Sequence, residues 1–117
     1  MSMVSEQWAF LQDVAKLLAF ISDNTELLAT AGEMWRTSEQ QRIYMRNGRS
    51  KTMHSQHLKR LAIDLNFFDK NDTSEVVPGN DPRIKEIGDY WESLSEENEW
   101  GGNWSSFKDY PHFQRTA

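Results

Sequence analysis

The sequence contains no cysteine, and this absence excludes a whole group of functions. Among its 117 residues no thiol is available for disulfide frameworks, thiolate zinc sites, iron–sulfur clusters or cysteine nucleophiles. Any metal must therefore be held by histidine and carboxylate side chains. Only three histidines are present, His54, His57 and His112, so a metal site would use most of them.

Long hydrophobic runs and a basic N-terminal segment are also missing. No stretch approaches the roughly 18 consecutive apolar residues of a membrane span. Residues 1–7 include Glu6 but no lysine or arginine, unlike the basic start of a secretory signal. We therefore expect cytoplasmic synthesis without a signal peptide and no membrane insertion. A hydrophobic fraction of 38% with 12% aromatic residues argues against disorder, and the length predicts one domain.

Basic residues are concentrated in one part of an acidic chain. The net charge is −5, yet residues 36–60 hold seven of the 13 lysines and arginines and only one acidic residue, Glu39. Such a segment is typical either of an anion-binding face or of a solvated helix and loop. No nucleic-acid-binding motif accompanies it, so we expect no nucleic-acid partner.

Hydrophobic periodicity predicts an α+β domain with helices packed on a small, mainly antiparallel sheet. The first helix is predicted from the apolar positions Trp8, Leu11, Val14, Ala15, Leu18 and Ile21. The predicted helices span residues 8–21, 37–45 and 82–94, and the predicted strands span residues 27–35 and 61–68, with short strands and turns from residue 96 onward. We expect Trp8, Trp35 and Trp91 in the core.

Four polar residues are candidates for a catalytic site. Asp64 lies in an apolar strand, where an unpaired carboxylate is costly to bury, so it needs either a cation or a nearby arginine. His57, His112 and Asp64 would make a three-ligand zinc site with an open fourth position. Asp109, three residues before His112, would then be the general base. The same ligand types also serve non-haem iron, usually with one residue between the first histidine and the carboxylate, whereas six intervene here.

Three blocks of the sequence resemble the zinc peptidases that cleave peptidoglycan stem peptides. Residues 55–64 (SQHLKRLAID) resemble the signature Ser-x-His-x-x-Gly-x-Ala-x-Asp, and residues 34–41 (MWRTSEQQ) resemble an aromatic-Arg-Thr-x-x-Gln segment. Residues 100–113 (WGGNWSSFKDYPHF) are similar to the end of the phage endolysin branch. The family includes D-alanyl-D-alanine carboxypeptidases, vancomycin-resistance dipeptidases and phage L-alanyl-D-glutamate endopeptidases. The resemblance implies a single catalytic domain over residues 1–117, with a fold of the Hedgehog/D,D-peptidase type.

The resemblance also implies roles for individual residues. Zinc is the implied cofactor, with His57, Asp64 and His112 as its ligands. Asp109 is the implied general base and later the acid. Arg36 is implied to stabilise the oxyanion or to hold a substrate carboxylate.

Substrate contacts are expected at Ser55, Trp104 and Arg60. Arg60 stands where the family has glycine; it either meets the D-glutamate carboxylate of a stem peptide or is a solvated side chain at the start of a strand. Trp100 and Trp104 either line the substrate groove or pack in the core. His54 matches no motif position, and we expect it to be a loop residue.

The expected function is hydrolysis of peptidoglycan stem peptides by a monomeric L-alanyl-D-glutamate endopeptidase of phage or prophage origin, acting on the cell wall after release. One alternative is a D-alanyl-D-alanine carboxypeptidase or dipeptidase. A second is a non-catalytic, zinc-containing peptidoglycan-binding module. A third is a small adaptor whose basic segment binds an acidic partner.

Overall fold

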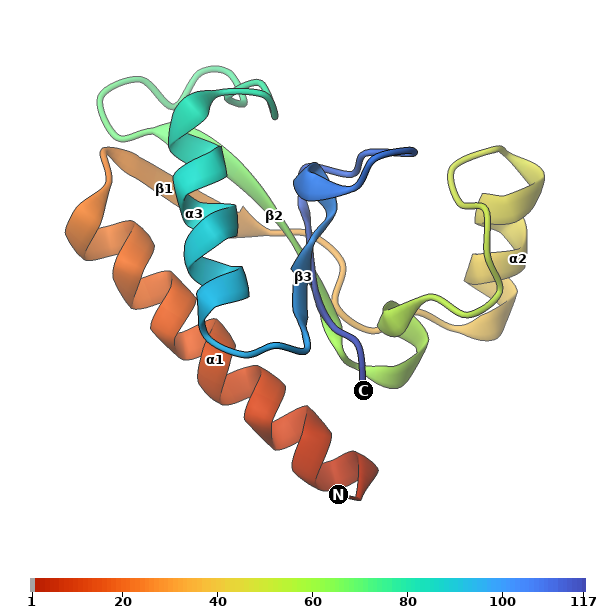
Figure 1. Ribbon diagram of the computed structural model, residues 1–117. Coiled ribbons are helices and arrows are strands. Elements are labelled where there is room, and N and C mark those ends of the chain that lie inside the picture. The colour runs from red at the N-terminus through yellow and green to blue at the C-terminus, as the bar shows by residue number, and fades with distance from the viewer. Residues whose placement is uncertain (1) are drawn as a thin grey trace.

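The computed structural model describes residues 2–117. They form three α-helices and one four-stranded antiparallel sheet, joined by loops (Figure 1). The helices are α1 (Met3–Asn24), α2 (Ser38–Arg46) and α3 (Pro82–Ser93). The strands are β1 (Leu27–Ala31), β2 (Ala62–Asp69), β3 (Asn98–Trp100) and β4 (His112–Arg115), in the spatial order β1-β2-β4-β3. Two short 3₁₀-helices are η1 (Gln56–Lys59) and η2 (Gly101–Asn103). The predicted α+β class is confirmed.

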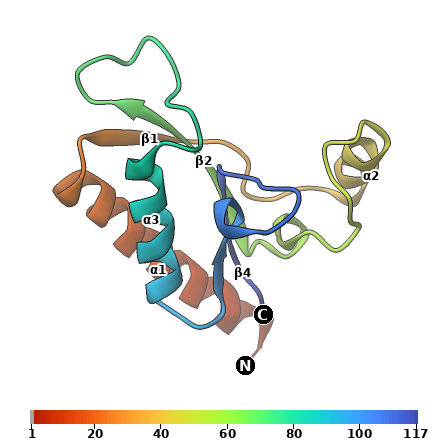
Figure 2. The same cartoon turned by 45° about the horizontal axis from the view of Figure 1, so that its top comes forward.

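The hydrophobic core lies between the sheet and the two helices α1 and α3 (Figures 1 and 2). Trp91 of α3 is fully buried and packs edge-on against Phe10 of α1 and Phe113 of β4. The helix α2 stands apart from this core, and its only buried side chain is Gln41. None of the helices within residues 2–117 combines the length and the apolar character that crossing a membrane requires.

The strand predicted over residues 27–35 is shorter in the structure and ends at Ala31. Pairing with β2 continues through two further hydrogen bonds, from the Gly32 N–H to the Asp64 carbonyl (2.7 Å) and from the Asp64 N–H to the Glu33 carbonyl (2.9 Å). The chain then leaves the sheet toward η1. Asp64 is therefore held by backbone bonds at the point where the first strand departs.

The prediction of the buried tryptophans is only partly confirmed. Trp91 is buried, and so is Trp100, but Trp8 is 61% exposed and Trp35 is 51% exposed, so their placement in the core was wrong. α1 carries apolar residues on two sides, and spacing alone could not choose between them. The side that packs on the core consists of Phe10, Val14, Leu17 and Ile21.

Candidate metal centre

The strand register and η1 bring the three predicted ligands together. Asp64 of β2 and His112 of β4 are directly opposite each other in the antiparallel pair. His57 comes from η1. Ser55 caps the N-terminus of this helix, and its hydroxyl accepts a hydrogen bond from the His57 N–H (3.3 Å). One donor atom from each of the three side chains lies within 4.8 Å of the other two. The group could hold a metal ion.

The spacing of the donor atoms suits a small tetrahedral ion. Asp64 Oδ1 is 3.2 Å from His57 Nε2 and 3.4 Å from His112 Nδ1. In a tetrahedral zinc site with bonds near 2.0–2.1 Å, neighbouring donor atoms are about 3.3 Å apart. Both imidazoles are almost completely buried, so the surrounding side chains and backbone fix their orientation.

The hydrogen bond on the far side of His57 decides which ring nitrogen carries the proton when the imidazole is neutral. His57 Nδ1 lies 2.8 Å from the Met34 carbonyl oxygen, which can only accept, so Nδ1 carries the hydrogen. In the neutral ring Nε2 then has a lone pair directed at the carboxylate of Asp64. Two electron-rich atoms face each other, an arrangement that a cation between them stabilises and that is typical of metal-binding histidines.

The orientation of the His112 ring is likewise fixed by a hydrogen-bond partner on its far side, which is itself held by a second hydrogen bond. Gln114 donates through its Nε2 to Glu99 Oε1 (3.1 Å), which orients the amide so that its oxygen faces His112 Nε2 at 2.7 Å. His112 Nε2 therefore donates, and in the neutral ring Nδ1 has a lone pair directed at Asp64. Glu99 and Gln114 are opposite each other in the β3–β4 register. Neither residue was predicted from the sequence to belong to the site.

Contacts within the group shift the pKa values of Asp64 and His112 in opposite directions. Burial disfavours ionisation of Asp64, but hydrogen bonds with His112 and His57 outweigh it and hold the pKa of Asp64 well below its usual range. Burial likewise opposes the charged form of His112, yet the hydrogen bonds to Asp64 and Gln114 raise the pKa of His112. A metal ion bound here would therefore compete with a proton for His112.

Asp109 is brought to the centre by a tight turn against Gly101. The Asp109 N–H donates to the Gly101 carbonyl (3.1 Å), and the His112 N–H donates to the Asp109 carbonyl (3.1 Å). A Cβ atom on residue 101 would lie 2.2 Å from the Asp109 carbonyl oxygen, so only glycine permits this approach. Burial raises the pKa of Asp109; the charge of Asp64 adds to this effect, and His112 opposes it. Such a carboxylate suits proton transfer.

Arg36 is held rigidly at the same site. It pairs with Glu33, and its Nη1 donates to Gln41 Oε1 (2.6 Å) and to Ser55 Oγ (3.4 Å). Tyr44 donates to the second oxygen of Glu33 (2.8 Å). Within residues 2–117, Nη2 of Arg36 has no hydrogen-bond partner. Glu33 and Gln41 were not singled out from the sequence, because nothing in their spacing marks them as partners of Arg36.

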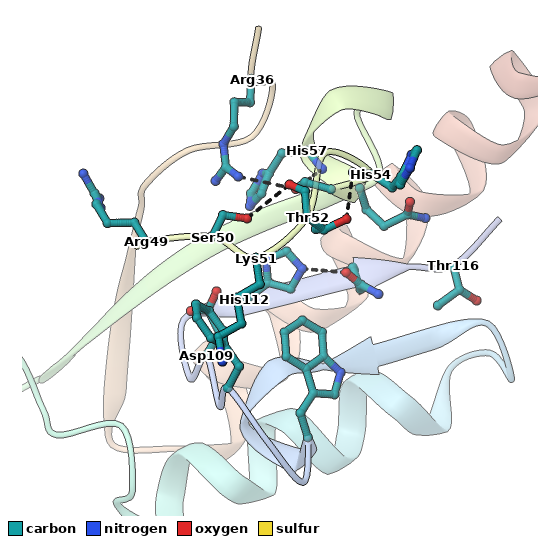
Figure 3. A pocket seen from close by; sticks show the side chains of 15 residues that line it. Arg36, Arg49, Ser50, Lys51, Thr52, His54, His57, Asp109, His112 and Thr116 are labelled. Atoms are coloured by element: carbon teal, nitrogen blue, oxygen red, sulfur yellow. Dashed lines mark hydrogen bonds between the residues drawn. The ribbon is translucent and has the colours of Figure 1, made fainter. Parts of the chain in front are cut away.

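Two cavities meet at this centre. One, of about 440 Å³, is lined by His57, His112, Asp109 and Arg36 among others (Figure 3). The other, of about 520 Å³, shares Asp109 and Arg36 and is lined also by Asp64. The candidate ligands therefore border open space on two sides.

Two of the three residues expected to contact substrate line a cavity at the centre, and the third does not. Ser55 and Trp104 line the first cavity, and the Trp104 ring is 5.3 Å from the His112 imidazole. His54 also lines this cavity but is not part of the ligand group. Arg60 lines neither cavity, so its position gives no support to the expected contact with a substrate carboxylate.

Arg60 instead follows η1 in a left-handed backbone conformation, with φ 59° and ψ 36°. Its guanidinium lies over the exposed ring of Trp35, 4.7 Å from the centroid. The left-handed region favours glycine, which explains why glycine suits this position in the signature that residues 55–64 resemble. With arginine at this position the backbone still adopts the left-handed conformation, and His57 still lies beside Asp64 and His112.

Two histidines and an aspartate, with a second carboxylate beside them, have the composition of a metal-dependent hydrolase site. Residues 48–115 match the peptidase M15 family described as D-alanyl-D-alanine carboxypeptidase. Because this match covers more than half of the sequence, the chain belongs to that family.

Two known proteins extend this comparison. The chain is 38% identical over 82 residues to the L-alanyl-D-glutamate peptidase of Listeria phage A118, a match that covers 70% of this chain and 28% of the phage protein. The chain thus spans little more than a quarter of the length of that relative. The crystal structure of the L-Ala D-Glu endopeptidase ChiX from Serratia marcescens superposes with a TM-score of 0.67 at 28% identity, covering 90% of this chain and 79% of that one.

Proposed function

We propose that this chain is a zinc-dependent peptidase that hydrolyses peptidoglycan stem peptides at the bond between L-alanine and D-glutamate. The observation that carries the proposal is the direction of the imidazole lone pairs. In their neutral forms, His57 and His112 both donate outward to fixed acceptors and direct the lone pair of the other ring nitrogen at Asp64. The names of the phage and Serratia relatives support the choice of bond.

His57, Asp64 and His112 would hold the ion. Zinc bound there would supply Lewis acidity toward a peptide carbonyl and make water a nucleophile near neutral pH. Asp109, whose pKa is raised mainly by burial, accepts the proton of the attacking water and passes it to the leaving amine. The free Nη2 of Arg36 donates to the oxygen on which negative charge develops.

The two cavities favour an endopeptidase over a carboxypeptidase. A carboxypeptidase needs space for only one or two residues beyond the scissile bond, whereas an endopeptidase must accommodate chain on both sides. Open space of about 440 Å³ and about 520 Å³ flanks the candidate ligands. The description of the family keeps D-alanyl-D-alanine carboxypeptidase as the second candidate. A pure binding module has no need of Asp109, so we place it behind both enzymes.

We further propose that the enzyme acts on the cell wall as a monomer. The proposed cleavage is tested by incubating the purified protein with purified peptidoglycan, with and without a chelator, and identifying the newly exposed amino termini. We expect new D-glutamyl amino termini that disappear with the chelator and return when zinc is added. The variant His57→Ala serves as the metal-deficient control. New termini at D-alanine, or none at all, would contradict the proposed bond.

A further inference from the structure

Two cations that line the first cavity have no acidic partner within residues 2–117. Arg49 and Lys51 follow α2 and line the cavity together with the candidate catalytic residues (Figure 3). Within residues 2–117 neither side chain forms an ion pair, whereas Arg36 beside them is paired with Glu33. Arg49 and Lys51 therefore leave positive charge unbalanced at the cavity.

Backbone and side-chain bonds fix the loop that carries these cations. The N–H groups of Arg49 and Ser50 both donate to the Tyr44 carbonyl at the end of α2 (2.8 and 3.2 Å). The buried Gln41 donates to Ser50 Oγ (2.7 Å) and to the Thr52 carbonyl. Since Gln41 also accepts from Arg36, the loop is tied directly to a candidate catalytic residue.

Aromatic rings support both cationic groups without neutralising them. The Arg49 guanidinium lies 4.4 Å from the centroid of the Tyr44 ring, and Lys51 Nζ lies 4.8 Å from that of Phe107. Such contacts hold a cation in place while its charge stays available to a ligand. Arg49 and Phe107 also line the second cavity. The positive charge of Arg49 is therefore accessible from both cavities.

We infer that Arg49 and Lys51 form a subsite that binds a free carboxylate of the substrate, namely the carboxylate of the glutamyl residue that is not used in a peptide bond. This inference rests on the proposed function and names the group that gives the enzyme its preference for glutamate. Arginine binds a carboxylate through two parallel hydrogen bonds, and lysine adds a point charge. The subsite takes the role that was expected of Arg60.

The test measures the hydrolysis of two synthetic peptides by the wild-type protein and by its variants. One peptide is L-alanyl-D-glutamyl-L-lysine with its free glutamyl carboxylate, and the other is identical except that this carboxylate is a carboxamide. We expect the wild-type protein to prefer the carboxylate in kcat/KM by about tenfold, the effect of one charge-assisted hydrogen bond near the lower end of its range. The variants Arg49→Gln and Lys51→Gln should each lose most of this preference, and Arg49→Lys should keep part of it.

Arg46→Gln is the matched control, because Arg46 is an exposed cation of α2 that lines neither cavity. It should keep the wild-type preference, and all variants should keep the wild-type metal content and circular dichroism spectrum. Equal kcat/KM for the two peptides, or a preference that survives both glutamine substitutions, would overturn the subsite while leaving the proposed function intact. Hydrolysis of neither peptide would contradict the proposed function itself, and the subsite with it.

Discussion

At the scale of single residues, Arg60 occupies a backbone conformation that ordinarily favours glycine. A non-glycine residue in the left-handed region costs about 1 kcal/mol, and the contact with Trp35 offsets part of this cost. Because Arg60→Gly and Arg60→Ala both remove that contact, their difference isolates the backbone cost. We expect Arg60→Gly to be more stable than Arg60→Ala by about 1 kcal/mol in urea-induced unfolding.

Equal stability of these two variants would contradict the assigned conformation. Peptidase activity provides a separate check, since Arg60 lines neither cavity. Both variants should therefore hydrolyse peptidoglycan at nearly the wild-type rate.

Asp109 tests the assignment of the proton-transfer group. Asparagine has nearly the same size and can keep the turn against Gly101, but it cannot accept a proton from water. We expect Asp109→Asn to bind zinc as the wild type does and to lose about 10²–10⁴-fold in turnover. Metal content by elemental analysis and initial rates on peptidoglycan measure the two effects separately. Activity close to that of the wild type would exclude Asp109 as the base.

At the scale of elements, the register of β2, β4 and β3 builds both the centre and its support. Opposite pairing places Asp64 against His112, and two residues further along β4 it places Glu99 against Gln114. Gln114 connects this second pairing to the candidate metal site, because it bonds Glu99 on one side and His112 on the other. Removing such a partner typically lowers metal affinity by about 10–100-fold.

We therefore expect Gln114→Ala to bind zinc about 10–100-fold more weakly than the wild type, measured by competition with a chromogenic chelator. Gln114→Glu, which keeps an acceptor for His112 Nε2, should retain most of the affinity. Nitrogen chemical shifts of the His112 ring report the tautomer independently of activity. An unchanged affinity in Gln114→Ala would show that His112 needs no orienting partner.

The sequence predicted the elements and the grouping of the three candidate ligands better than it predicted their surroundings. Helix periodicity and the strand of residues 61–68 follow from local patterns, and the candidate ligands follow from residue chemistry together with the motif resemblance. The partnership of Glu99 with Gln114 depends on strand register, which no local pattern encodes. The exposure of Trp8 depends on which apolar side of α1 meets the sheet. Arg49 and Lys51 were visible only as part of a basic segment, because their meeting at the cavity depends on the anchored loop.

At the scale of the whole molecule, the candidate metal centre and the hydrophobic core lie in different parts of the fold. The core joins α1, α3 and the sheet through residues such as Phe10, Trp91 and Phe113, none of which is a candidate ligand. The centre joins η1, β2 and β4. Removal of the metal should therefore leave the fold intact at room temperature and lower its resistance to heat.

Ligand binding to the folded state adds about 4 kcal/mol when free zinc is about 1,000 times its Kd. For a domain of this size 1 kcal/mol shifts Tm by roughly 4 °C, so we expect a chelator to lower Tm by about 15 °C. The far-UV circular dichroism spectrum at 25 °C should not change. His57→Ala should show little response to the chelator, since it lacks one ligand. A wild-type Tm that does not depend on zinc would contradict a resident metal, and loss of the spectrum at 25 °C would show that the core depends on it.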